Sequence, residues 1–336
     1  MGGVISPNII KQFQIQHIFP SHIYTNDLIL PLNTLPKQYI DGVVRALSAV
    51  RCSIKYNTLH DRGGYGSIYL ADRKDCSGSV QEVCVKIPHT RDFSLCPEAL
   101  IQCTVCSILE GAGIYGAVPH VFDIFQYAGE TRFSMSYIKG LRSIDYIIDS
   151  SNPEVAFLQF ISQIALLLGF LEEKMHFDHR DLKADNIWIK SEPIQYKLSI
   201  GSKMWSITAP FQVVLLDFGF SCIGNEDGIA IISLSDGILP RVDPCPKEGR
   251  DLFQLISSLW SIPQIRSVIG QTLSTDIELL LSYRNKSYIN LITKTLQQQW
   301  VYILVSDYNF IHPPLHPTSL LHFLSIKYPQ ICIHSE

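Results

Sequence analysis

The sequence predicts an α+β protein in which a small strand-rich part is followed by a larger helical part. Short β-branched runs bounded by turn residues recur between residues 54 and 138, and the chain beyond Asp251 has a helical pattern rich in leucine. Strands followed by helices are typical of two lobes with a cleft between them. We therefore expect an N-terminal extension over 1–50, a first lobe over 51–137 and a second lobe over 138–336.

The strand-rich part is supported by five segments, taken in chain order. The runs "SIYLA" (67–71) and "EVCVKI" (82–87) predict two strands on either side of a turn-rich stretch. Pro97 then opens a helix whose apolar residues recur at helical spacing. "HVFDIFQY" (120–127) and the segment 132–138 predict two more strands, joined by the turn "AGE".

The second part begins with a long helix. Asn152 and Pro153 form a good helix start, and apolar residues recur on one face up to Met175. Two strands follow, at 187–190 and at 213–219, and the second of them is apolar enough to be buried. The remainder of the chain is expected to be mostly helical.

The composition is that of a globular protein with a large core. Of its 336 residues, 17% are charged and 46% are apolar. A formal net charge of −4 argues against general or direct nucleic-acid binding. The most apolar run, at 164–171, is too short to span a bilayer, so no transmembrane segment is expected. Gly2 and Ser6 fit the N-myristoylation pattern, which stays an open alternative.

The cysteines lack the spacing of a disulfide framework. There are nine, and most lie in apolar segments, including Cys84, Cys103, Cys106 and Cys222. This predicts reduced thiols and a cytoplasmic or nuclear location. Cys103 and Cys106 form a C-x-x-C, but no second pair of cysteines or histidines lies nearby, so packing in the core is the better interpretation.

Three features of the first lobe suit the binding of phosphate groups. The glycines of "DRGGYG" (61–66) precede a strand, where amides without a Cβ can approach a phosphate, although a plain hairpin is an equal alternative. Lys86 lies on an apolar strand, where an ammonium group needs an anionic partner. Glu98 in the next helix is such a partner, and Glu110 is the alternative.

The second lobe offers a carboxylate and metal ligands. In "HRDLKADN" (179–186), four residues separate Asp181 from Asn186, so one turn can aim both at the same cleft, and Lys183 adds a positive charge between them. Asp217 follows a buried strand, where a carboxylate without a cation would be costly, and Mg²⁺ shared with Asn186 would remove that cost. A phosphate cradle, a cation, metal ligands and a carboxylate are the parts that phosphoryl transfer from ATP needs.

Together these motifs resemble a eukaryotic-type protein kinase domain over about residues 54 to 300. The resemblance implies the bilobal protein-kinase-like fold and a serine/threonine kinase that uses ATP and Mg²⁺. Its catalytic residues would be Asp181, Lys183 and Lys86, and its metal ligands Asn186 and Asp217. The nucleotide-binding positions that it implies are Asp61, Arg62, Gly63, Gly64, Tyr65, Gly66, Ile68, Cys84, Lys86, Glu98, Met135, Ser136, Tyr137 and Ile138.

Within that resemblance, Met135 is similar to the gatekeeper, and residues 136–138 are similar to the hinge that bonds adenine through its backbone. The chain also departs from the family. Asp61 stands where the first glycine of the loop is expected, and the spacing from Lys86 to Glu98 is short. No A-P-E sequence follows the D-F-G sequence, and Asp251 resembles the aspartate that opens the helix after the activation segment.

Two departures resemble the haspin-type kinases. The sequence predicts a hairpin between 190 and 213, and the β-like "GIAII" follows D-F-G, although haspins usually depart from D-F-G and this chain keeps it. The segment after D-F-G is short, so the resemblance implies an enzyme active without phosphorylation, in which Arg180 steadies its own loop. Acidic residues after D-F-G predict a protein substrate with basic residues near the phosphosite: Glu226, Asp227 and Asp236.

Two other classes of protein fit the same residues. A pseudokinase or scaffold would bind nucleotide or a partner without catalysis, and Asp61 is the feature that supports it. A small-molecule kinase of related fold is disfavoured by "HRDLK", which that group generally lacks.

Overall fold

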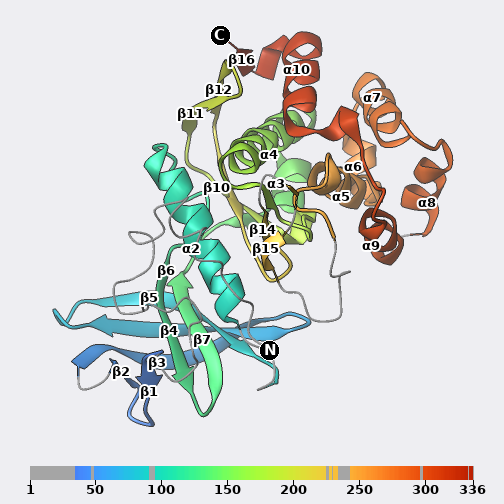
Figure 1. Ribbon diagram of the computed structural model, residues 1–336. Helices are drawn as coiled ribbons and strands as arrows, with labels where there is room; N and C mark the ends of the chain where they lie inside the picture. The colour runs from blue at the N-terminus through green and yellow to red at the C-terminus, as the bar shows by residue number, and fades with distance from the viewer. Residues whose placement is uncertain are drawn as a thin grey trace. The chain divides into compact units, whose positions relative to one another are not determined.

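The computed structural model describes residues 35–46, 49–90, 95–224, 227–228, 230–233, 243–295, 298–331 and 333–335. The chain divides into two compact units (Figure 1). The first holds the described residues up to Ile138 together with 231–233, and the second holds the other described residues from Lys139 onward. The first unit is rich in strands and the second in helices, which confirms the predicted α+β class. Gly2, Glu226 and Asp236 lie outside the described residues.

Among the described residues of the first unit, seven strands form a closed barrel in the order β1-β2-β3-β4-β5-β7-β6. They are β1 (Lys37–Gln38), β2 (Val43–Ala46), β3 (Ala49–Arg62), β4 (Gly66–Asp75), β5 (Val80–Pro88), β6 (Val121–Tyr127) and β7 (Glu130–Ser136). Neighbouring strands are antiparallel. The exception is β1 with β6, which pair in parallel at Lys37 and Gln126 and so close the barrel.

The described part of the predicted N-terminal extension, from residue 35, belongs to this barrel. It supplies β1, β2 and the first residues of β3. Strands of two and four residues are too short to show a hydrophobic period, so the sequence could not reveal them. Strands β4 and β5 also extend beyond their apolar runs, because polar residues continue the ladder as far as the pair Lys74 and Val80.

The core of the first unit lies among apolar side chains of the barrel strands. These residues are Val44, Cys52, Ile54, Ala71, Val83, Val85 and Phe125. Helix α2 (Cys96–Gly111) has Pro97 in its first turn, as the sequence predicts, and most of its residues are buried. A buried ion pair also links three strands: Arg73 Nε donates to Asp123 Oδ2 at 2.7 Å, and Ser134 Oγ donates to the same oxygen at 2.6 Å.

The second unit is organised around helix α4 (Pro153–Met175). Asn152 caps its N-terminus by accepting a hydrogen bond from the backbone of Val155, which confirms the predicted start. The helix is long and apolar enough to cross a membrane, with a mean hydropathy of 1.8, but 83% of that stretch is buried inside the protein. It is therefore the core helix of this unit.

The second unit also contains shorter strands and helices (Figure 1). The strands are β8 (Leu141–Arg142), β9 (Phe177–Asp178), β10 (Ile187–Lys190), β11 (Ile194–Ile200), β12 (Lys203–Ala209), β13 (Gln212–Leu215), β14 (Cys222–Gly224) and β16 (Ile333–Ser335). The helices are α3 (Ser143–Asp149), α5 (Arg250–Trp260), α6 (Pro263–Val268), α7 (Gln271–Leu281), α8 (Ser287–Thr295), α9 (Gln298–Ser306) and α10 (Pro317–Lys327). A last strand, β15 (Ala230–Ser233), spans the boundary between the units.

The hairpin predicted between residues 190 and 213 is present as β11 and β12, which pair in register from Ile194 with Ala209 to Ile200 with Lys203. Strand β10 pairs with β13 and with β8. The hairpin and α10 approach α4 closely at Gly169. A Cβ there would lie 3.1 Å from atoms of both Ile200 and Pro317, so only a glycine fits without displacing them.

Cys222 and Cys245 form a disulfide, with their Cα atoms 6.3 Å apart. The prediction of a reduced thiol is therefore wrong for Cys222, and the argument from cysteines to an intracellular location does not hold for this pair. The sequence could not show the pairing, because the fold joins residues 23 positions apart. The free cysteines among the described residues are Cys52, Cys76, Cys84, Cys96, Cys103 and Cys106.

Candidate active site

The glycine-rich turn joins β3 to β4 and is exposed over residues 61–65. It is closed by a hydrogen bond from the backbone N–H of Gly63 to the carbonyl of Gly66, at 2.9 Å. Asp61 lies opposite Ile68 in the ladder, and its carboxylate accepts the backbone N–H of Arg62 at 2.7 Å. The turn is thus the loop of a β-hairpin, and its use as a phosphate cradle stays a prediction.

Gly66 is the glycine of this turn that the packing requires. A Cβ at this position would lie 2.7 Å from the carbonyl oxygen of Ile87 and 3.7 Å from Cε of Lys86. A Cβ at Gly64, in contrast, would have no atom within 4 Å. Gly66 therefore lets β4 run close beside the part of β5 that carries Lys86.

Lys86 forms a buried ion pair with Glu98. Nζ lies 2.5 Å from Oε1, and the two side chains are 10% and 2% exposed. Glu98 is in the first turn of α2, whereas Glu110 lies in its last turn near His120. Of the two glutamates that the sequence offered, the one paired with Lys86 is Glu98. Pairing with Glu98 lowers the free-energy cost of burying the ammonium group on this apolar strand.

The residues expected to meet the adenine lie in the middle of β5 and at the end of β7. Cys84 pairs with Met135 in the ladder, and Val83 pairs with Ser136. The N–H of Ser136 donates to the carbonyl of His120 at 2.8 Å, so this hinge amide already has a hydrogen-bond acceptor within the protein. Tyr137 follows, with its ring edge-on to His60 at 5.4 Å. Ile138 is the last residue of this segment in the first unit.

In the second unit, the structure brings together Asp181, Lys183 and Asn186. The Lys183 ammonium lies 3.0 and 3.2 Å from the two carboxylate oxygens of Asp181. The Asn186 amide nitrogen donates to the backbone carbonyl of Asp181 at 2.8 Å and to its Oδ2 at 3.1 Å. A 3₁₀ turn at Ala184–Asn186 makes this possible, so one turn does direct both polar groups to one place.

Asp251 holds the backbone that precedes this cluster. Its carboxylate, in the first turn of α5, accepts the N–H of His179 at 2.6 Å and of Arg180 at 2.8 Å. Arg180 has a positive φ of 64°, which a non-glycine residue adopts only when its surroundings enforce it. Burial, together with the neighbouring carboxylate of Asp178, raises the pKa of Asp251. The predicted opening of a helix at Asp251 agrees with the start of α5 at Arg250.

The guanidinium of Arg180 is buried against Asp243. Its Nη2 lies 3.2 Å from Oδ2 of Asp243, and its side chain is 3% exposed. Asp243 also contacts Arg250 Nη1 at 2.6 Å and the ammonium of Lys247. Burial and the nearby Arg250 lower the pKa of Arg180 to about 10, so it is still charged at neutral pH. The buried ion pair with Asp243 therefore lets Arg180 stabilise its own loop.

The backbone immediately before Asp217 is hydrogen-bonded to Asn186. The N–H of Leu216 donates to the Asn186 carbonyl at 2.9 Å, and the Leu216 carbonyl is 3.0 Å from Nε2 of His179. Asp217 has a positive φ of 59° and is exposed. Water can therefore solvate this carboxylate, so burial gives no reason for a cation here, and the role of Asp217 as a metal ligand stays a prediction. The buried strand β13 ends two residues earlier, at Leu215.

A small cavity of about 30 Å³, room for about one water molecule, adjoins the carboxylate. Its lining includes Asp181, Lys183, Gln254, Ser257, Ile292 and Tyr302. Ser257 Oγ and Gln254 Oε1 are buried and have no hydrogen-bond partner among the described residues. Sequence reasoning missed both residues, because they lie on α5, about 75 positions from the motif, and are ordinary helix residues in pattern. The cavity thus offers unsatisfied polar groups beside Asp181.

Comparison with known proteins gives a partial similarity to one kinase. No protein-family model matches the chain. A probable serine/threonine-protein kinase of Dictyostelium discoideum is 28% identical to it over 150 residues. The match covers 42% of this chain and 31% of that protein, so it spans about a third of the relative's length. This distant similarity suggests a kinase-like protein.

Replacing Gly66 by alanine should separate β4 from β5 beside Lys86. The added Cβ cannot fit against the Ile87 carbonyl, so we expect a loss of about 1–3 kcal/mol in the free energy of local opening. Hydrogen–deuterium exchange of the β5 amides measures it. Gly64→Ala is the matched control, because its Cβ meets open space, and it should leave exchange unchanged. Equal exchange in both variants would contradict the steric account.

Proposed function

We propose that the protein is an ATP-dependent kinase that transfers the γ-phosphate to serine or threonine of a protein substrate. The observation that carries this proposal is the cluster of Asp181, Lys183 and Asn186, a buried carboxylate held by an ammonium and an amide. The buried pair of Lys86 and Glu98 supports it, because it presents a fixed cation on a strand next to a glycine-rich turn. The similarity to a probable kinase also supports it.

Each residue has a separate role in this reaction. Asp181 would accept the proton of the attacking hydroxyl, and Lys183 would offset negative charge on the phosphoryl group in transfer. Lys86 would contact the phosphates of ATP, held in place by Glu98. These residues stabilise charge that develops only during transfer, so their main effect is expected on the rate.

The donor atoms fit a magnesium ion. Asn186 directs its amide nitrogen to Asp181, which leaves its side-chain oxygen for a metal, and Asp217 offers an exposed carboxylate. Oxygen ligands of this kind are those that Mg²⁺ prefers. The ion would neutralise charge on the phosphates of bound ATP. We propose that Asn186 and Asp217 hold it.

The cavity beside Asp181 supports an acceptor hydroxyl as the substrate group. It has room for one small polar group, and the buried side-chain oxygens of Ser257 and Gln254 have no hydrogen-bond partner in the described part of the chain. The exposed Asp227, together with the sequence neighbours Glu226 and Asp236, favours a protein substrate with basic residues near the phosphosite.

We further propose that the enzyme is of the haspin-like branch. The β11–β12 hairpin stands between β10 and β13, where the resemblance requires an insertion. Strands β14 and β15 follow D-F-G in place of the usual segment ending in A-P-E. The retained D-F-G sequence is the feature that differs from most haspins.

The position of Arg180 supports activity without phosphorylation. In kinases switched by phosphorylation, the arginine before the catalytic aspartate pairs with a phosphate on the activation segment. Here Arg180 already pairs with Asp243 and is buried. Ser221, one of the hydroxyl residues after D-F-G, is also buried and donates to the His179 carbonyl at 3.2 Å.

Replacing Asp181 by asparagine should reduce phosphoryl transfer by about 100-fold or more, because the base is lost while the shape is kept. Asp185→Asn is the matched control: this residue lies in the same turn but is exposed, and activity should persist. The assay uses radiolabelled ATP, Mg²⁺ and a basic protein. A wild-type rate of phosphoryl transfer by Asp181→Asn would contradict the proposal. No transfer by the wild type would favour a pseudokinase, and labelling of small hydroxyl compounds alone would favour a small-molecule kinase.

Phosphatase treatment of the purified protein should leave its specific activity unchanged, because no phosphate is needed to order Arg180. The double variant Ser233→Ala with Ser235→Ala should likewise match the wild type. Activity before and after treatment, with phosphate content followed by mass spectrometry, provides the measurement. Loss of activity in both experiments would show that a phosphorylation switch exists.

A further inference from the structure

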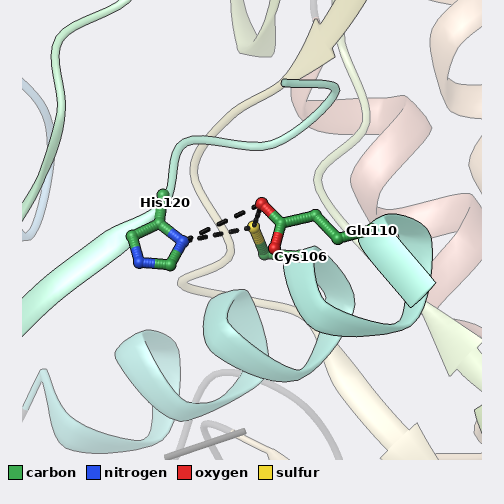
Figure 2. Close-up of side chains that lie close together, drawn as sticks. All are labelled: Cys106, Glu110 and His120. Carbon is green, nitrogen blue, oxygen red and sulfur yellow. Dashed lines mark hydrogen bonds and ion pairs between the residues drawn. The ribbon is translucent and has the colours of Figure 1, made fainter. Parts of the chain in front are cut away.

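Three potential metal ligands meet at the end of α2 (Figure 2), whereas Glu98 of the Lys86–Glu98 pair lies in the first turn of that helix. Cys106 and Glu110 lie on the helix, and His120 precedes β6. The Cys106 sulfur is 3.3 Å from Oε1 of Glu110 and 4.0 Å from Nδ1 of His120. The third distance, from Nδ1 of His120 to Oε1 of Glu110, is 3.9 Å.

These distances match one face of a tetrahedral site. Zinc lies about 2.3 Å from a thiolate sulfur and about 2.0–2.1 Å from imidazole nitrogen or carboxylate oxygen, which places the ligand atoms about 3.3–3.6 Å apart. The separation of Sγ from Oε1 already lies in that range, and the two separations that involve Nδ1 of His120 exceed the values for their atom pairs by about 0.4–0.6 Å, which a small rotation of the imidazole can supply. Few changes are therefore needed for an ion to contact all three atoms.

The backbone holds the ligands in place from two sides. Cys106 and Glu110 are four residues apart, so they lie on the same face of α2. His120 is fixed to the end of β7: its N–H donates to Ser136 Oγ at 2.8 Å, and its carbonyl accepts the Ser136 N–H at 2.8 Å. Its ring packs against Phe122, with the centroids 5.2 Å apart. Such support favours a preformed site.

We propose that Cys106, Glu110 and His120 bind a Zn²⁺ ion through Sγ, a carboxylate oxygen and Nδ1, with water as the fourth ligand. Solvent can reach this position, because the side chains of His120 and Glu110 are 55% and 36% exposed. The thiol proton of Cys106 leaves to water as the ion binds. The thiolate and the carboxylate then balance the charge of +2, and the ion ties the end of α2 to the start of β6.

The donor set selects zinc over the hard cations. A thiolate and an imidazole suit Zn²⁺, whereas Mg²⁺ and Ca²⁺ prefer oxygen ligands throughout. Without an ion, the cluster is a hydrogen-bonded group, because burial and the nearby Glu110 raise the pKa of the Cys106 thiol to about 12 and it keeps its proton. The inference is independent of the proposed kinase activity, since it concerns none of the catalytic residues.

The test is zinc binding by the full chain after treatment with a chelator. Titration against a chromophoric chelator should give one tightly bound Zn²⁺ per chain. His120→Ala should weaken it by more than about tenfold, the minimum expected for the loss of a ligand. His120→Ala should keep the melting temperature of the metal-free wild type, because its side chain is exposed, but lose the rise that zinc produces.

Cobalt(II) supplies the second readout. Bound in place of zinc, it should show sulfur-to-metal charge-transfer absorption, which Cys106→Ser abolishes. The matched controls are the exposed residues Cys76→Ser and His322→Ala, which should bind as the wild type does. Sub-stoichiometric binding, wild-type affinity in His120→Ala, or absorption that survives in Cys106→Ser would each overturn the proposal.

Discussion

The geometry of the candidate catalytic cluster depends on one buried carboxylate, that of Asp251. It accepts two consecutive backbone N–H groups, those of His179 and Arg180, and so holds the left-handed conformation of Arg180. Two buried amides without this acceptor would cost about 1–3 kcal/mol each. The position of Asp181, the next residue along the chain, follows from that turn. A helix start thus fixes a loop more than 70 residues earlier in the sequence.

A network of buried charges surrounds this interaction. Arg250 contacts Asp178 and Asp243, and Asp243 also contacts Arg180 and Lys247. Burial opposes the ionisation of Asp178, but the charges of Arg250 and Arg180 and the hydrogen bonds with Asp251 and Arg250 together outweigh it and lower the pKa of that carboxyl. Each charge in the network has an opposite partner, so the loop is held without an added anion. This is why Arg180 is better described as part of the scaffold than as a phosphate receptor.

The sequence predicts the parts of this structure in which a hydrophobic period extends over many residues or several motif residues lie close together in the chain. Helix α4, its Asn152 cap and the hairpin inserted after β10 follow the expected pattern. The partner of Lys86 could be identified only from the structure, because α2 contains two glutamates and the fold decides which of them reaches the lysine. Motif spacing does place Asp181 and Asn186 in one turn, because only four residues separate them.

Other features depend on contacts that a linear pattern does not carry. Strand β1 is two residues long, and the Cys222–Cys245 disulfide joins residues 23 positions apart. The exposure of Asp217 depends on β13 ending two residues before it, a boundary that apolar runs do not fix. His120 joins Cys106 only because the chain reverses after α2. These are tertiary effects, and no local propensity encodes them.

The most direct test of this account is the rate of γ-phosphate transfer by Asp251→Asn, with hydrogen exchange of residues 179–186 followed in the same samples. The amide keeps the shape of the side chain but puts a donor where a second acceptor is needed, so we predict faster exchange in the loop and a rate lowered by about tenfold or more. The exposed Asp145→Asn should change neither. A wild-type rate in Asp251→Asn, despite a loosened loop, would contradict the claim that this carboxylate sets the catalytic geometry.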